Sequence, residues 1–192
     1  MQTADELVAL TGTFGLPMPR AYAFGYLGWE MARSGQVAEG LRLAAETERL
    51  LSIIGALVHG SFSQGLHAET LLIAAQYAEA SSQIEKALAT AQAGERGYLS
   101  RLYRTRAAVL RHLRGSTAPE VEIDLRRAVA TAREQDAKGW EIAAAADLAV
   151  HLAETGRRDE ARDVLAPVYG CFTEGFEVQP LRRAKMLLGE FG

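Results

Sequence analysis

The chain has 192 residues, of which 48% are hydrophobic and 23% are charged, close to the averages of soluble folded proteins. This composition argues against a disordered chain and against a coiled coil, and a single cysteine, Cys171, excludes an internal disulfide and a cysteine-based zinc site. The net charge is −3, but residues 94–133 carry nine basic and four acidic side chains, so the middle of the chain is a basic segment.

The apolar residues point to helix throughout. Alanine and leucine dominate them, while the β-branched and aromatic residues that favour strands are sparse. The N-terminal residues Met1–Glu6 are acidic where a signal peptide would be basic, and no apolar run approaches the ~18 residues that span a membrane. We therefore expect a cytoplasmic, all-α protein.

Apolar residues recur with helical spacing along the N-terminal half, and the breaks fall at glycine, proline or polar clusters. The pattern predicts a helix over about residues 4–14, a helical hairpin over about 19–54 and a second hairpin over about 66–93. The first hairpin turns at Ser34-Gly35, where glycine can supply a left-handed cap.

The second hairpin is less regular in sequence. Its first helix is expected to begin between Ser63 and His67 and to run through Ala75 and Ala78. The preceding stretch, residues 60–65, has the two glycines of a phosphate-binding loop but lacks the Lys and Ser/Thr that hold phosphate and Mg²⁺. We therefore predict an ordinary loop there.

The C-terminal half contains two further predicted hairpins. They cover about residues 96–135, with Thr117 as the N-cap of the second helix, and about residues 139–169, joined at Gly156. A last helix, about residues 180–188, would cap the exposed end of the stack, as a terminal repeat must. No low-complexity linker divides the chain, so we expect a single domain over residues 1–192.

The hairpins are expected to repeat with a period of about 34 residues, which suggests the tetratricopeptide (TPR) pattern. Only glycine or alanine lets two helix backbones approach closely where they cross. Small residues recur at matching places, namely Gly28, Gly35 and Gly40 in the first hairpin and Ala149, Gly156 and Ala161 in the last. The predicted fold is an α-α superhelix, a TPR-like solenoid; a generic helical bundle is the alternative.

A more specific likeness is carried by three runs near the C-terminus. They are Trp140-Glu141-Ile142-Ala143-Ala144-Ala145, Gly156-Arg157-Arg158-Asp159-Glu160-Ala161-Arg162 and Phe172-Thr173-Glu174-Gly175-Phe176. Over about residues 137–188 the chain resembles the C-terminal TPR-like segment of large bacterial signalling proteins. In those proteins an adenylate or guanylate cyclase domain, or another signalling domain, precedes a STAND-type ATPase and the repeats. Cys171 stands where that family usually has an aromatic residue.

The resemblance implies a non-catalytic regulatory segment, because the cyclase signature and the phosphate loop of the ATPase are both missing. The residues agree with this. The histidines, which are His59, His67, His112 and His151, form no metal-binding face, and no nucleophile elbow surrounds Ser61 or Ser63. We expect no catalytic residue, no metal and no cofactor. Asp147 interrupts an alanine-rich face and is expected to be half buried and paired with an arginine.

Four arginines form the first candidate binding surface. Arg101, Arg104 and Arg111 lie at i, i+3 and i+10 on one predicted helix, and Arg114 extends their face. The guanidinium fork suits carboxylate or phosphate. The alternative is a solvated face neutralised by nearby carboxylates, those of Glu95, Glu120, Glu122 and Asp124. Nucleic acid would require more positive charge and interleaved aromatics, so an acidic protein segment is the favoured partner.

Aromatic residues form the second candidate surface. Tyr22, Tyr26 and Trp29 recur at i, i+4 and i+7, with Arg33 one turn further. Such side chains serve as peptide anchors on repeat proteins, and inter-helix packing is the alternative.

The favoured function is a protein-interaction and regulatory module. Its partner would be a protein or peptide segment, or upstream domains of the same polypeptide; a homodimer is a further arrangement, and no membrane is involved. The alternatives are a sensor domain of a transcription regulator and a small-molecule-binding repeat domain.

Overall fold

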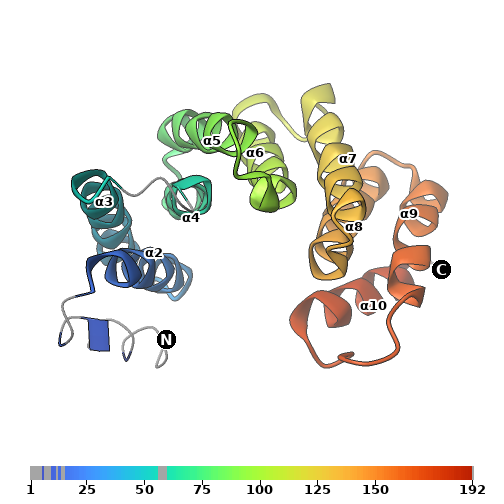
Figure 1. Ribbon diagram of the computed structural model, residues 1–192. Helices are drawn as coiled ribbons and strands as arrows, with labels where there is room; N and C mark the ends of the chain where they lie inside the picture. The colour runs from blue at the N-terminus through green and yellow to red at the C-terminus, as the bar shows by residue number, and fades with distance from the viewer. Residues whose placement is uncertain (1–5, 7–9, 12, 14–15, 56–59, 192) are drawn as a thin grey trace. The chain divides into compact units, whose positions relative to one another are not determined.

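The computed structural model describes residues 6, 10, 11, 13, 16–55 and 60–191. In this part of the chain nine α-helices and one short 3-10 helix are present, and no strand (Figure 1). They are α2 (Pro17–Arg33), α3 (Val37–Ile53), α4 (Gly60–Ile73), α5 (Tyr77–Gln92), η1 (Arg96–Tyr98), α6 (Leu99–Arg114), α7 (Pro119–Glu134), α8 (Lys138–Glu154), α9 (Arg158–Gly170) and α10 (Gln179–Phe191). The predicted all-α fold is confirmed, whereas the helix predicted over residues 4–14 lies largely outside the described residues.

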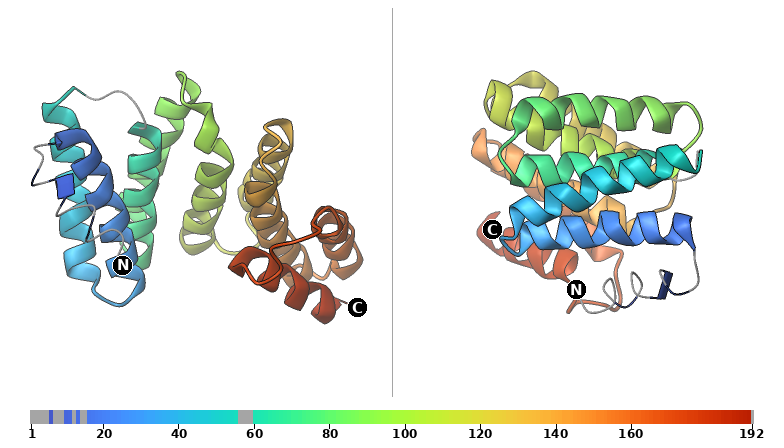
Figure 2. Two further views of the ribbon diagram at one scale, coloured as in Figure 1. Left: turned by 60° about the horizontal axis from the view of Figure 1, so that its bottom comes forward. Right: turned by 90° about the vertical axis from the view of Figure 1, so that its left-hand side faces the viewer.

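The chain forms two compact units, Met1–Tyr98 (unit 1) and Leu99–Gly192 (unit 2). Unit 1 contains the hairpins α2–α3 and α4–α5, and unit 2 contains α6–α7 and α8–α9. The two helices of each hairpin lie side by side (Figure 2). The capping helix is confirmed, because α10 packs on α8 and α9 and buries Leu181 and Ala184 in the core of unit 2. That residues 1–192 make one domain stays a prediction.

Small residues bring the helices of a hairpin together, as the repeat pattern predicts. A Cβ atom on Gly28 would lie 2.8 Å from the carbonyl oxygen of Gly40, and a Cβ on Gly40 would lie 2.6 Å from that of Gly28. No side chain fits between the backbones of α2 and α3 at this point. In the last hairpin Ala149 and Ala161 hold the matching positions and are fully buried.

Four turns between helices share one hydrogen-bond pattern, the Schellman motif. In the first, the amide of Gln36 donates to the carbonyl of Met31 at 2.8 Å, and in the α4–α5 turn the amide of Gln76 donates to Leu71 at 2.9 Å. The motif needs one residue with a positive φ. That residue is a glycine in two turns but Ala75 (φ 58°) in the α4–α5 turn and Asp136 (φ 49°) between α7 and α8.

The turn at Ala75 corrects the sequence prediction. We expected Ala75 and Ala78 within one continuous helix, but α4 ends at Ile73 and α5 begins at Tyr77. The physical reason is that the Schellman hydrogen bonds and the packing of both helices outweigh the high helix propensity of alanine.

Replacing Ala75 by glycine is expected to raise the free energy of unfolding of unit 1 by about 0.5–1 kcal/mol. A left-handed L-residue costs about 1–2 kcal/mol, part of which is offset by the larger backbone entropy of glycine. Urea unfolding followed by the fluorescence of Trp29, in a Trp140→Phe background, measures the change. The reverse substitution at the matching site, Gly35→Ala, should lower stability; a loss of stability in Ala75→Gly would contradict this account.

The start of α4 overturns a second expectation. Residues 60–65, predicted as a loop, form the first turns of α4, with Ser61 and Phe62 buried. The carboxylate of Glu95 accepts hydrogen bonds from the amides of Gly60 (3.1 Å) and Ser61 (2.8 Å). This cap satisfies two amides that a helix start leaves without intrahelical partners, so the helix begins earlier than its local sequence indicates.

Three smaller expectations are also wrong. The first helices of the hairpins begin at Pro17, Gly60, Leu99 and Lys138, so the repeat interval is 43, 39 and 39 residues rather than about 34. The helices and their connections are longer than the TPR pattern assumes. Thr117 is not the N-cap of α7: Ala118 is, without a side-chain hydrogen bond, because Pro119 already fixes the first helical residue. Leu113 falls on the apolar face that helical spacing gives to about residues 96–113, a face expected to point inward, but it is exposed.

Candidate functional site

A small cavity in unit 2 brings together part of the predicted basic face. Its volume is about 200 Å³, and we call it the basic pocket. It is lined by Arg104, Ala107, Ala108, Arg111, Leu125, Asp147, Val150 and Arg183, which come from α6, α7, α8 and α10. Three arginine side chains therefore line a cavity whose remaining walls are mostly small and apolar.

The arginines of the basic pocket are held by two carboxylates of α8. Arg104 Nε donates to Asp147 Oδ2 at 2.7 Å, and Arg183 Nη1 donates to Asp147 Oδ1 at 2.5 Å. Arg111 Nη2 donates to Glu154 Oε2 at 2.6 Å. The prediction that Asp147 is half buried and paired with arginine is confirmed. With three cations and two anions, the pocket keeps one positive charge.

The other two predicted arginines of the basic face lie apart from the pocket lining. The guanidinium of Arg101 stands over the ring of Trp140, 5.8 Å from its centroid. Arg114 pairs with Glu120 at the end of α6. Of the four arginines, Arg104 and Arg111 are therefore the two that share a cavity.

Carboxylates neutralise much of the basic segment, as the alternative interpretation expected. Arg106 forms a two-hydrogen-bond pair with the buried Asp124. Glu122 pairs with Arg126 and Arg157: burial raises its pKa, but the hydrogen bonds and charges of the two arginines outweigh burial and lower the pKa overall. Glu95, expected to take part, instead caps α4.

The predicted aromatic residues of α2 separate into two groups in unit 1. The ring of Tyr26 lies 5.3 Å from that of Phe62 on α4, and Phe62 lies 4.6 Å from Tyr98 on η1. Burial first, and then Glu95 and Tyr98, raise the pKa of Tyr22, so that its hydroxyl stays protonated at neutral pH. Tyr26 is 45% exposed, which leaves its ring available for contact.

Trp29 and Arg33 form the second group. The guanidinium of Arg33 lies 4.6 Å from the centroid of the Trp29 ring and 3.5 Å from the carboxylate of Glu30. Stacking of this kind holds the arginine in one place and contributes about 0.5–1 kcal/mol at an exposed site.

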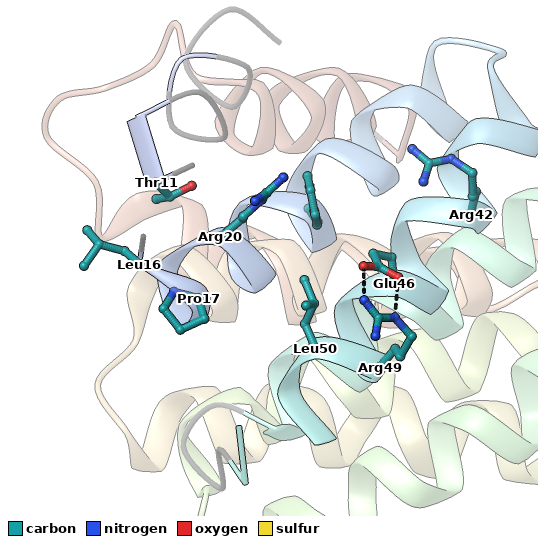
Figure 3. Close-up of a pocket in the computed structure, with 9 residues that line it drawn as sticks. Thr11, Leu16, Pro17, Arg20, Arg42, Glu46, Arg49 and Leu50 are labelled. Carbon is teal, nitrogen blue, oxygen red and sulfur yellow. Dashed lines mark hydrogen bonds and ion pairs between the residues drawn. The ribbon is translucent and has the colours of Figure 1, made fainter. Parts of the chain in front are cut away.

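Unit 1 also has a larger open cavity of about 640 Å³ between α2 and α3 (Figure 3). Arg20 and Phe24 line it from α2, and Arg42, Glu46 and Arg49 line it from α3. Arg49 donates two hydrogen bonds to Glu46, as Figure 3 shows, and Arg42 donates two to Glu39. The two α3 arginines are thus already neutralised along their own helix.

The histidines lie in separate places. His67 Nδ1 is 2.8 Å from Glu48 Oε1, and His112 is exposed, while His59 lies outside the described residues. His151 is buried between helices, and that burial lowers its pKa. No group of three or more His, Cys, Asp or Glu in the described residues is placed to hold a metal ion.

Sequence reasoning missed the residues that complete these surfaces from distant parts of the chain. Arg183 meets Asp147 only because α10 packs on α8. Phe62 meets Tyr26 only because α4 packs on α2, and Tyr98 of η1 lies against Phe62. Arg183 lies between the buried Leu181 and Ala184 in the amphipathic last helix, at the edge of its buried face, and that position was the one signal available.

The fold is that of a TPR-like repeat protein. Crystal structures of nearly identical TPR-like repeats of a kinesin light chain from Podosopora anserina are similar to it. The first, a single-residue variant, has a TM-score of 0.67 and 19% identity, covering 91% of this chain and 85% of that chain. The second has a TM-score of 0.66 at 19% identity, covering 91% and 86%. At this identity the likeness shows the fold alone.

Comparisons of sequence give no match. No protein-family model matches the chain, and neither does any curated protein. None of the described helices combines the length and apolar character that a membrane span requires.

Proposed function

We propose that this chain is a non-catalytic protein-interaction module and that the basic pocket of unit 2 binds a carboxylate of an acidic segment. The observation that carries the proposal is the convergence of Arg104, Arg111 and Arg183 on one cavity. Repeat proteins of this class bind partners along surfaces built from successive hairpins, which agrees with a pocket formed by α6, α8 and α10.

The dimensions and charge of the basic pocket support a side-chain ligand rather than a larger molecule. A volume of about 200 Å³ is below the roughly 300–1,000 Å³ of a usual small-molecule site. Arg104 and Arg183 are 22% and 33% exposed at their side chains, so their interactions with a ligand are only partly screened by water. Ala107, Ala108 and Val150 leave room for the methylene groups of a glutamate.

A labelled hexaglutamate peptide tests the proposal. We expect it to bind the full chain in fluorescence anisotropy at about 20 mM salt, more weakly at about 150 mM, and hexaglutamine not to bind. The double substitution Arg104→Gln and Arg111→Gln should weaken binding about tenfold or more, because charged hydrogen bonds contribute roughly 1.5–3 kcal/mol each.

The matched control removes two arginines from the exposed side of α9, Arg158→Gln and Arg162→Gln, with the same change in net charge. Equal weakening in both double variants, with circular dichroism unchanged, would mean that the peptide responds to net charge and not to the basic pocket.

The resemblance over residues 137–188 supports a narrower proposal about the partner. The acidic segment would belong to upstream cyclase or ATPase domains of a bacterial cytoplasmic signalling protein, in the same polypeptide, whose activity the module regulates. Binding of this chain to such domains encoded with it, measured by calorimetry, tests that proposal. Tyr22, Tyr26, Trp29 and Arg33 of unit 1 would give the partner a second contact surface.

A further inference from the structure

The basic pocket already contains a carboxylate at the point where its arginines converge. Asp147, from α8, accepts one hydrogen bond on each oxygen, from Arg104 of α6 and from Arg183 of α10. Among the described residues neither arginine has another carboxylate partner. The Asp147 side chain is 24% exposed, so water and a ligand can reach it.

We propose that Asp147 holds the position that the partner's carboxylate takes in the complex, and that Arg183 of α10 belongs to the binding site. Two guanidinium groups from different helices, aimed at the two oxygens of one carboxylate beside a cavity, form a receptor for that group. A ligand carboxylate replaces Asp147 with the same hydrogen bonds and the same charge. Asp147 therefore competes with the ligand and sets how acidic a segment must be to bind.

The inference rests on the proposed function but makes an opposite prediction for a neighbouring residue. Removing an arginine weakens binding, whereas removing the charge of Asp147 strengthens it. Glu154 does not hold this position, because within the described part of the chain its carboxylate pairs with one arginine, Arg111. The inference also gives α10 a role beyond capping: it supplies a ligand-binding side chain as well as Leu181 and Ala184 to the core.

Asp147→Asn in the full chain is the decisive variant. We expect hexaglutamate to bind it about fivefold tighter or more than the wild type, because a neutral amide competes less well for a guanidinium than a carboxylate does. Asp163→Asn, exposed on α9, makes the same change in net charge and should leave affinity within about twofold. Arg183→Gln should weaken binding about tenfold and abolish the gain in the double variant with Asp147→Asn.

The outcomes separate the two proposals. If hexaglutamate binds neither the wild type nor a folded Asp147→Asn protein, the proposed function fails and this inference falls with it. If the wild type binds through Arg104 and Arg111 but Asp147→Asn binds no tighter than Asp163→Asn, this inference alone is overturned. If Asp147→Asn does not fold, Arg183→Gln decides the matter, with Arg182→Gln as its control. Unchanged affinity in Arg183→Gln overturns this inference. A tenfold loss of affinity in Arg183→Gln that Arg182→Gln does not reproduce supports it.

Discussion

Replacing Gly40 by alanine is expected to lower the free energy of unfolding of unit 1 by about 2–3 kcal/mol, in the upper part of the roughly 1–3 kcal/mol that a group forced into a filled contact usually costs. The new Cβ would lie 2.6 Å from the carbonyl oxygen of Gly28 and 3.0 Å from the amide nitrogen of Ala32. Both are backbone atoms of α2, which cannot rotate away as a side chain can. The two helices must separate, and this loss exceeds the gain of up to ~1 kcal/mol from alanine in a helix.

The measurement is urea unfolding in a Trp140→Phe background, where Trp29 of unit 1 is the single tryptophan. Gly25→Ala is the matched control. Gly25, in α2, is a buried helical glycine like Gly40 of α3, but a Cβ atom on Gly25 would make ordinary contacts of 3.5 Å or more. It should be neutral or slightly stabilising. Equal midpoints for Gly40→Ala and Gly25→Ala would show that the close approach of Gly28 and Gly40 does not limit this hairpin.

Asp124→Asn is expected to destabilise unit 2 by about 3–5 kcal/mol, the cost of removing one partner of a buried ion pair. Asp124 is 2% exposed and accepts hydrogen bonds from Arg106 Nε (2.7 Å) and Nη2 (2.6 Å), which tie α6 to α7. Asparagine has nearly the same shape, so the loss reflects charge and hydrogen bonding rather than a cavity. It offers the partly buried guanidinium of Arg106 one neutral acceptor in place of the two charged oxygens of the carboxylate.

Trp140 reports this change when Trp29 is replaced by phenylalanine. Asp163→Asn, on the exposed side of α9, is the control and should stay within about 0.5 kcal/mol of the wild type. The double variant Asp124→Leu with Arg106→Met should recover much of the lost stability, because apolar residues of similar volume often replace a buried pair at little cost. A double variant no more stable than Asp124→Asn would show that the pair itself contributes net stability.

The sequence predicts well those parts of the fold that local chemistry determines. Gly35 and Gly156 mark their turns because a left-handed residue is needed there, and Pro119 marks the start of α7 because it cannot occupy a helix interior. The small residues at Gly28 and Gly40 predict the close crossing for the same reason. The two larger misses are Ala75, where tertiary packing overrides propensity, and residues 60–65, where the deciding residue is Glu95.

The binding surfaces are predicted only in part, because a binding site combines helices that are far apart in sequence. Helical periodicity places Arg104 and Arg111 on one face of α6, and the structure puts both in the basic pocket. Helical periodicity does not indicate that Arg183 reaches the same pocket from α10. For Tyr26 likewise, the pattern marks a face of α2, while its neighbours Phe62 and Tyr98 follow from the packing of α4 and η1.

The cap that Glu95 provides also determines where unit 1 can be cut. A fragment ending at Gln92 would contain every residue of α2, α3, α4 and α5. It would lack the carboxylate that accepts from Gly60 and Ser61, so the first turn of α4 would fray although its own sequence is intact. The shortest fragment of unit 1 that keeps all its helices intact must therefore extend beyond Gln92, the last residue of α5, and include Glu95.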